Sequence, residues 1–480
     1  MAGVGLRYSE LRDLFRPIPS APLGLVAFGL VACSAAPSTG SLPRRQPPPA
    51  GPAVAEVAAP TADGRASWAT YHGNNERAGV GPSTPTFGDP VLRWRADLDA
   101  EIYAEPLAIN GRLIVVTEND TAYALDASSG EIIWEQHVAD PVPLSSLPCG
   151  NIDPSGFTST PVIDSTSNIV YAVGRVQPTH HELYAFNVES GSVLFHRSVD
   201  PPGDDPRFLQ QRGALALANG RVYVAFGGNF GDCGPYHGWV VGVNADGSGD
   251  LVTYQVPTPR EAGIWAPPGP AVDGDGSLLV ATGNGESEDA FDYANAVVRL
   301  SPDLELLDYW APANWASLSA TDTDVGSIGP MLVGAGQVLQ SGKNGMGYLL
   351  RASALGGIGG ELFSARVCRG AYGGAAYEPP TLIVPCVDGL AAIEVDDGAF
   401  RIAWRAGEGQ LNSPIIAYGS VWSIDQRNAA LLQIDPTDGS IRSRTSLDGP
   451  IRAHFTTPSA VGDALFVPAG HSVLAFGAPP

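Results

Sequence analysis

Positive charge is scarce in this chain of 480 residues, and the scarcity limits its partners. Lys and Arg together number 27 against 50 Asp and Glu, which gives a formal net charge of −23 at pH 7. Nucleic-acid binding depends largely on Lys and Arg side chains that neutralise phosphates. Because an acidic surface repels a phosphate backbone, we expect no nucleic-acid partner.

The chain also lacks the short motifs that mark several metal, haem and catalytic sites. It has no Cys-x-x-Cys, no Cys-x-x-Cys-His, no Gly-Lys-Ser/Thr loop, no Gly-x-Ser-x-Gly elbow and no His-Glu-x-x-His helix. Those spacings bind zinc, attach haem, cradle phosphate or present a nucleophile or a metal. A fused c-type haem domain and a phosphate loop are therefore excluded, whereas a catalytic triad assembled from distant loops is not.

Helical periodicity is missing as well, and a repeat takes its place. No window of a dozen residues keeps a 3.6-residue apolar period, and 58 Gly and 42 Pro interrupt the chain throughout. In the first copy of the repeat, residues 106–109 and 113–116 flank Asn-Gly, and residues 122–126 lead through Ser-Gly to residues 132–134. Four short strands and three turns cannot bury their apolar faces alone, so we expect the copies to stack radially.

Eight copies predict an all-β fold, an eight-bladed β-propeller of four-stranded antiparallel sheets. The copies begin at Pro106, Pro161, Ala214, Pro270, Pro330, Ala375, Pro414 and Pro458. Large aromatic residues recur in the fourth strand and are expected to fill the wedge between blades: Trp134, Phe195, Tyr254, Trp310, Phe363 and Trp404. Seven blades remain the alternative if the weak copy near Ala214 or Ala375 is an insertion.

The last copy stops before its aromatic strand, and an orphan strand lies upstream of the first copy. Residues 473–476 end the last copy, whereas residues 91–95 carry an isolated Trp94. We predict that residues 91–96 pair with residues 473–476 or with the strand next to them, so that an N-terminal strand closes the ring.

The N-terminus predicts export and a lipid anchor. Three arginines precede an apolar stretch of about a dozen residues, which is too short to span a bilayer but suits a signal peptide. The ending Leu-Val-Ala-Cys33 resembles the lipobox of bacterial lipoproteins, with Cys33 as the lipidated residue; an ordinary secretory signal is the alternative. We therefore predict a signal peptide over residues 1–33, a disordered Pro/Ala-rich tether over 34–67 and the propeller over 68–480.

Four further cysteines predict two disulfides in an exported protein. Cys149, Cys233, Cys368 and Cys386 allow three connectivities. Cys149 and Cys233 lie in loops of consecutive blades, and Cys368 and Cys386 lie within one blade and the segment before it. We predict the pairs Cys149–Cys233 and Cys368–Cys386; a metal cluster is disfavoured because no Cys-x-x-Cys occurs.

The repeat also resembles that of a known family. The segment 124–134, Ala-Leu-Asp-x-x-Ser-Gly-x-x-x-Trp, resembles the repeat of pyrroloquinoline-quinone (PQQ)-like β-propellers, and the resemblance covers about residues 68–476. That family contains quinoprotein alcohol dehydrogenases, which use PQQ and calcium. It also contains envelope lipoproteins similar to the assembly factor BamB, which bind other proteins and hold no cofactor. A blade-packing repeat specifies the fold and leaves function open between these branches.

Several segments resemble the cofactor site of the dehydrogenase branch. By that resemblance, Trp265 would lie under the quinone and Asn284 would bind calcium. Asp322 and Asp324 would belong to the catalytic and metal-binding stretch, and Lys343 would contact the quinone oxygens. An aromatic platform, hard oxygen ligands and a cation are the groups that this cofactor and a calcium ion require.

Two departures weigh against a working cofactor site. Asn229 stands where the resemblance implies a metal-binding Glu, and an amide removes one negative charge from a calcium site. The chain also has no adjacent Cys-Cys pair, so the vicinal disulfide of those enzymes is absent.

The sequence therefore favours a non-catalytic, lipid-anchored propeller that acts as a protein-binding or scaffold module. We expect a monomer without a cofactor that faces the periplasm or the cell exterior and binds envelope proteins or peptides. The alternative is a PQQ- and calcium-dependent dehydrogenase of alcohols or sugars, with Asp322 or Asp324 as its base.

Overall fold

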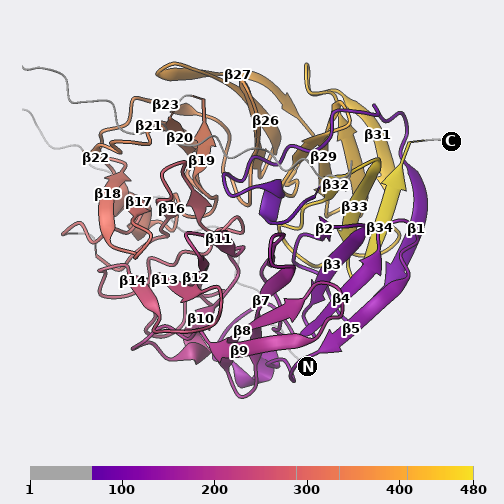
Figure 1. Cartoon of the computed structure of the whole chain (residues 1–480). Coiled ribbons are helices and arrows are strands. Elements are labelled where there is room, and N and C mark those ends of the chain that lie inside the picture. Colours follow the sequence, from indigo (N-terminus) through magenta and orange to yellow (C-terminus); the bar gives the residue numbers. More distant parts are fainter. Residues whose placement is uncertain (1–66, 288, 335, 408, 479–480) are drawn as a thin grey trace, which may run out of the picture. The chain divides into compact units, whose positions relative to one another are not determined.

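In the computed structural model, residues 67–287, 289–334, 336–407 and 409–478 form eight β-sheets arranged as a ring (Figure 1). The predicted signal peptide with Cys33 and the predicted tether up to residue 66 lie outside the described residues. Among the described residues, helical structure is limited to α1 (Trp315–Ala320) and three short 3₁₀ helices, η1 (Tyr71–Gly73), η2 (Leu144–Ser146) and η3 (Pro206–Phe208). None of these helices is long and apolar enough to cross a membrane.

Each blade is built from strands that follow one another in the chain. Blade one contains β2 (Leu107–Ile109), β3 (Arg112–Thr117), β4 (Thr121–Asp126) and β5 (Ile132–His137), and blade two contains β6 (Val162–Asp164), β7 (Ile169–Val176), β8 (His180–Asn187) and β9 (Val193–Ser198). Blade three contains β10 (Leu209–Gln210), β11 (Ala216–Ala218), β12 (Arg221–Gly228), β13 (Trp239–Asn244) and β14 (Val252–Gln255). Blade four contains β15 (Ala271–Val272), β16 (Leu278–Ala281), β17 (Val297–Leu300) and β18 (Leu306–Ala311).

The remaining blades follow the same order. Blade five contains β19 (Met331–Val333), β20 (Gln337–Gln340), β21 (Met346–Arg351) and β23 (Phe363–Arg366), and blade six contains β24 (Ala376–Glu378), β25 (Thr381–Cys386), β26 (Gly389–Asp396) and β27 (Ala399–Ala406). Blade seven contains β28 (Ile415–Ala417), β29 (Ser420–Asp425), β30 (Ala430–Ile434) and β31 (Ile441–Ser446). Blade eight contains β32 (Ser459–Val461), β33 (Ala464–Ala469) and β34 (Ser472–Gly477), and its fourth strand is β1 (Val91–Asp97) from the N-terminal side of the ring. A short strand, β22 (Gly357–Ile358), adds to the outer edge of blade four in parallel with β18.

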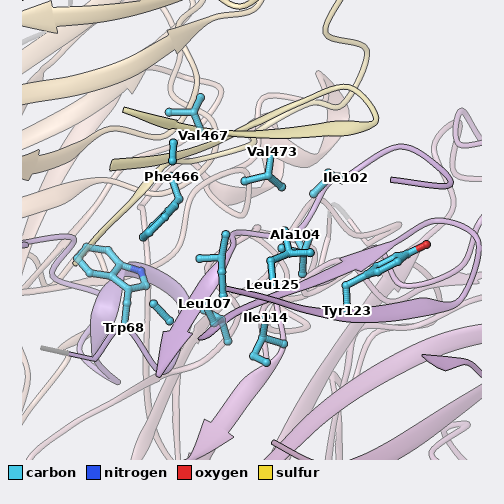
Figure 2. Packing of buried hydrophobic residues seen from close by; sticks show 14 of the residues in the cluster. Trp68, Ile102, Ala104, Leu107, Ile114, Tyr123, Leu125, Phe466, Val467 and Val473 are labelled. Carbon is cyan, nitrogen blue, oxygen red and sulfur yellow. The ribbon is translucent and has the colours of Figure 1, made fainter. Parts of the chain in front are cut away.

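The prediction of eight blades is confirmed, and the seven-blade alternative is wrong. The copies near Ala214 and Ala375 form complete sheets in blades three and six. The closing strand is also confirmed, because β1 pairs antiparallel with β34 from Val91 opposite Gly477 to Asp97 opposite Ser472. Figure 2 shows the packing behind this closure, where Phe466 and Val473 of blade eight lie against Leu107 and Leu125 of blade one.

An outer-strand aromatic joins each of several blades to the next. The Trp134 indole donates a hydrogen bond to the Val188 carbonyl of blade two at 2.9 Å, and Trp404 donates to Pro436 in the same way. The turn of the following blade offers a glycine at that point: a Cβ on Gly191 would lie 2.6 Å from the Trp134 ring. The glycine in the repeat is therefore required by the tryptophan of the preceding blade, in addition to its positive φ of 69°.

Two glycine substitutions separate these requirements. In Gly191→Ala the new residue would have to adopt a positive φ, and its Cβ would also clash with the Trp134 ring. In Gly398→Ala the residue would also have a positive φ, of 81°, but the space around its Cβ is open. Left-handed backbone costs an alanine about 1–2 kcal/mol, and overpacking adds about 1–3 kcal/mol. We expect denaturant unfolding to show Gly191→Ala at least about 1 kcal/mol less stable than Gly398→Ala; equal losses would contradict the docking role.

Residues 68–81, which we call the plug, cross the central channel on one face of the ring. The plug exchanges main-chain hydrogen bonds with the innermost strands β2, β6, β15, β24 and β28, and Asn75 donates to the Leu217 carbonyl of β11. Its Arg77 is fully buried and donates to the carbonyls of Leu215 and Pro270. Figure 1 shows this indigo segment, with its short helix, in the middle of the ring. Residues 68–81 carry none of the repeat pattern.

Both predicted disulfides are confirmed. Cys149 and Cys233 are bonded, as are Cys368 and Cys386, and each pair has a Cα–Cα separation of 6.2 Å. The separations lie within the range that a disulfide requires. The first bond joins the loop between blades one and two to a loop of blade three, and the second joins the end of β25 in blade six to the segment that leads into that blade.

Candidate functional site

The loops opposite the plug enclose a cavity of about 580 Å³, which we call the funnel. Because the strands of a blade alternate in direction, the loops after each second and each fourth strand meet on this face. The funnel is lined by residues from these loops: Asn151, Gln210, Arg212, Gly228, Asn229, Phe230, Gly231, Asp232, Tyr236, Gly263, Trp265, Gly283, Asn284, Asp322, Lys343, Tyr372, Val387, Gln410, His454 and Phe455. Its size suits a small molecule or a short peptide segment.

Four of the residues predicted from the sequence meet in the funnel. Trp265, Asn284, Asp322 and Lys343 all line it, although they come from loops of blades four and five that span 79 positions of the chain. The fifth, Asp324, has no exposed surface and lies under Lys343. The ring therefore brings four of these residues to one cavity, whereas Asp324 is covered rather than open to a ligand.

Three aromatic rings form the apolar wall of the funnel. The rings of Tyr372 and Phe455 are nearly parallel, with centroids 6.3 Å apart, and each lies 6.4 Å from the Trp265 ring at 52°. At the mouth, Phe230 is 68% exposed, more than any other large apolar side chain that the structure describes. The funnel thus offers apolar ring faces at its wall and a further ring at its entrance.

Lys343 is held by two carboxylates. Its ammonium lies 2.5 Å from Asp322 Oδ1 and 2.7 Å from Asp324 Oδ2, the second contact being an ion pair without hydrogen-bond alignment. The same ammonium is 5.5 Å from the Trp265 ring centroid. Lys343 is the single lysine of the chain, and this feature of the composition also distinguishes it from the other cations.

The pKa values of this pair follow from burial and charge. Burial lowers the pKa of Lys343, but Asp324 and Asp322 outweigh it and hold that pKa above its usual range. Burial raises the pKa of Asp324, and the Lys343 charge opposes the rise. Lys343 therefore keeps its proton at neutral pH and supplies the positive charge that the covered carboxylate needs.

Removing the lysine charge should leave a buried carboxylate uncompensated. We expect Lys343→Met to lose about 3 kcal/mol at pH 8, as for a broken buried ion pair. Because the pKa of Asp324 would then lie further above its unfolded value, the folded state would take up a proton as the pH falls, and the deficit would shrink toward pH 5. Denaturant unfolding at pH 8 and pH 5 measures this change; a deficit that is the same at both would contradict it. The double variant with Asp324→Asn is the control and should regain most of the loss.

Asn229 is already fully bonded within the protein. Its side-chain oxygen accepts from Arg175 Nη1 at 2.9 Å, and its side-chain nitrogen donates to the Arg207 carbonyl at 2.7 Å. The side chain is buried, so both polar atoms serve the loop rather than a ligand. The Asn284 side chain donates from Nδ2 to Glu261 Oε2 at 3.3 Å.

These contacts do not fit a calcium ion. A protein calcium site gathers several oxygen ligands, usually with two or more carboxylates. Here Asn229 contributes no charge, and Asp322 and Asp324 share the ammonium of Lys343. Among the described residues, the one trio of Cys, His, Asp or Glu with metal-binding proximity is Cys368, Cys386 and Asp388, and its cysteines are disulfide-bonded. The aromatic and cationic groups that a quinone needs are present, but the metal set that accompanies it is not.

Arg212 at the bottom of the funnel is a functional candidate that the sequence comparison missed. The side chain is half-buried, and burial lowers its pKa while the charges of Tyr103 and Glu118 oppose the shift. Within the described part of the chain it has no ion pair and no side-chain hydrogen bond, and its guanidinium lies 5.5 Å from the Phe455 ring. The sequence Gln-Gln-Arg-Gly carries no motif that could have identified it.

A disulfide joins two loops of the funnel wall. Cys149 lies in the loop that carries Asn151, and Cys233 follows Phe230, Gly231 and Asp232. The bond holds the loop between blades one and two against the loop of blade three. The wall of the site is therefore fixed covalently on this side.

Comparison with known proteins agrees with this architecture. Residues 92–305 match the family model described as outer membrane protein assembly factor BamB. The match supports a likeness to PQQ-like β-propellers over that part of the chain. A search of curated protein sequences finds no match.

Solved structures of both branches resemble the propeller. The quinohemoprotein alcohol dehydrogenase from Comamonas testosteroni is 14% identical with a TM-score of 0.67, over 86% of this chain and 82% of that one. BamB from Moraxella catarrhalis is 13% identical with a TM-score of 0.56, over 81% of this chain and 99% of that one. A europium-containing methanol dehydrogenase is 13% identical with a TM-score of 0.64, over 84% of this chain and 90% of that one. At these identities the likeness shows the fold, and the function rests on the site.

Proposed function

We propose that the protein is an exported, lipid-anchored propeller of the bacterial cell envelope that binds a protein or peptide partner and catalyses no reaction. The observation that carries this proposal is the state of the funnel's polar groups. The Asn229 side chain is hydrogen-bonded to Arg175 and to the Arg207 carbonyl, and the carboxylates of Asp322 and Asp324 are ion-paired with Lys343. The funnel keeps aromatic and charged surface for recognition while its metal ligands are engaged.

Further features support the location and the partner class. Two disulfides are typical of proteins that fold in an oxidising compartment, and the predicted lipobox at Cys33 would tie the propeller to a membrane. The likeness to a BamB structure agrees with an envelope protein. The net charge of −23 supports the absence of a nucleic-acid partner and favours a soluble, monomeric propeller.

The second candidate is a PQQ-dependent dehydrogenase of alcohols or sugars. The convergence of Trp265, Asn284, Asp322 and Lys343 on one cavity favours it. In that function Trp265 and Lys343 would hold the quinone, which supplies the oxidising chemistry, and Asp322 would be the accessible carboxylate. The engaged metal ligands argue against it.

Titration with PQQ and calcium separates the two candidates. Trp265 reports binding by quenching of tryptophan fluorescence, and any ligand bound by the folded state alone raises its melting temperature. We expect neither quenching nor stabilisation when metal-free protein receives PQQ with Ca²⁺. Saturable quenching together with a calcium-dependent rise in melting temperature would overturn the proposal in favour of the dehydrogenase.

A further inference from the structure

The funnel is closed at its base. Arg212, His454 and Phe455 line both the funnel and a small gap of about 10 Å³ beneath it, and the other side of that gap is lined by Tyr71 of the plug. The Tyr71 side chain is 2% exposed, and the plug is bonded to the inner strands of six blades. A polypeptide can therefore enter the funnel but cannot thread through the channel.

A cation without a partner stands at this base. Of the half-buried Arg and Lys side chains in the part of the chain that the structure describes, Arg212 is the one with neither an ion pair nor a side-chain hydrogen bond. Lys343, the other cation of the funnel, is neutralised by Asp322 and Asp324. A half-buried guanidinium without a carboxylate in direct contact is unfavourable, and a carboxylate matches its paired donors.

The surfaces around Arg212 are apolar. Phe455 lies against the guanidinium, Tyr372 lies nearly parallel to Phe455, and Trp265 completes the wall. A group that reaches Arg212 must therefore pass between ring faces, which favour an apolar or aromatic side chain next to the anion. The exposed Phe230 adds a ring at the entrance.

We propose that the funnel captures the carboxyl terminus of a partner polypeptide, with the terminal carboxylate on Arg212 and an apolar last side chain against Trp265, Tyr372 and Phe455. A closed base favours a chain end over a passing segment, and the free cation at that base matches the charge that a chain end carries. This inference rests on the proposed function, since it names the chemistry of the partner.

Three matched peptides and two variants test the inference. The probes are Ala-Ala-Ala-Phe with a free carboxylate, the same peptide with a C-terminal amide, and acetyl-Ala-Glu-Ala-Phe-amide, whose carboxylate lies on a side chain. Binding is followed by calorimetry and tryptophan fluorescence in the presence of a chelator. We expect the free carboxylate to bind at least tenfold more tightly than either amide, and Arg212→Met to abolish that preference.

Arg351→Met is the control, because Arg351 is exposed at the end of β21 and lines no part of the funnel. It should keep the preference of the parent protein. Equal binding of acid and amide, an unchanged preference in Arg212→Met, tighter binding of the glutamate peptide, or no binding of any peptide at millimolar concentration would each overturn the inference. Calcium-dependent binding of PQQ, measured separately without the chelator, would overturn the proposed function instead, so the two failures are distinguishable.

Discussion

Replacing Val91–Asp97 with a Gly/Ser segment of equal length should open the ring. β34 would lose its outer antiparallel partner and keep only β33, and Trp94, which donates to the Ala127 carbonyl of blade one, would no longer join blades eight and one. Loss of a buried tryptophan alone costs about 3–5 kcal/mol, and an uncovered strand is a template for pairing with another chain. We expect a strongly lowered melting temperature and self-association, measured by thermal unfolding and by size-exclusion chromatography with light scattering.

The control changes only outward-facing residues of β1. Arg93→Ser with Arg95→Ser keeps Trp94 and Ala96, which are the buried positions of the strand. The exposed ion pairs to Asp463 and Asp97 contribute about 1 kcal/mol or less each, so this variant should remain a monomer with a melting temperature near that of the parent. Should the Gly/Ser variant behave like this control, β1 would not be the strand that closes the ring.

Arg77→Met should be the most damaging point substitution in the plug. The guanidinium donates to the carbonyls of Leu215 and Pro270 and to the Thr70 hydroxyl, and nothing of the side chain is exposed. The substitution removes these donations and leaves the buried Pro270 carbonyl without a side-chain donor, and each unsatisfied group costs about 1–3 kcal/mol. We expect a loss of at least about 3 kcal/mol in denaturant unfolding.

A second measurement separates a loosened plug from a general loss of stability. Limited proteolysis should cleave Arg77→Met first near residues 67–81, while the parent stays intact there because the plug is bonded to the inner strands. A loss below about 1 kcal/mol with unchanged cleavage would show that Arg77 does not hold the plug.

The sequence predicted the fold well because the fold depends on a repeated local pattern. The Asp-to-Gly turns, the outer aromatic residues and the missing last strand are each visible over a few residues, and together they predicted eight blades and the pairing of β1 with β34. The disulfides followed from the blade register, since Cys149 and Cys233 fall in loops that the ring brings together.

The plug and Arg77 could not be predicted in the same way. Residues 68–81 precede the first copy and share none of its pattern, and they acquire a role only when six blades surround them. A buried arginine contradicts the usual exposure of that residue type, so composition would place Arg77 at the surface. Its burial depends on carbonyl groups supplied by blades three and four.

The funnel was predicted in part. Trp265, Asn284, Asp322 and Lys343 were recognised by resemblance, and the ring brings them together. Their state could not be predicted, because the bond of Asn229 to Arg175 joins blades three and two, and the ion pair of Asp324 with Lys343 joins two loops of blade five. Arg212 was missed for the same reason: what distinguishes it is the lack of a partner in the folded protein, which no sequence motif records.

Terbium luminescence tests the central claim that the metal ligands of the funnel are engaged. Tb³⁺ replaces Ca²⁺ at oxygen sites, and Trp265 in the funnel wall would sensitise its emission if the ion bound beside Asn284 and Asp322. We predict that Tb³⁺ at micromolar concentration gives no emission that Ca²⁺ displaces, in the parent and in Trp265→Phe alike. Emission that saturates, is displaced by Ca²⁺ and is lost in Trp265→Phe would contradict the account and restore a metal-dependent dehydrogenase.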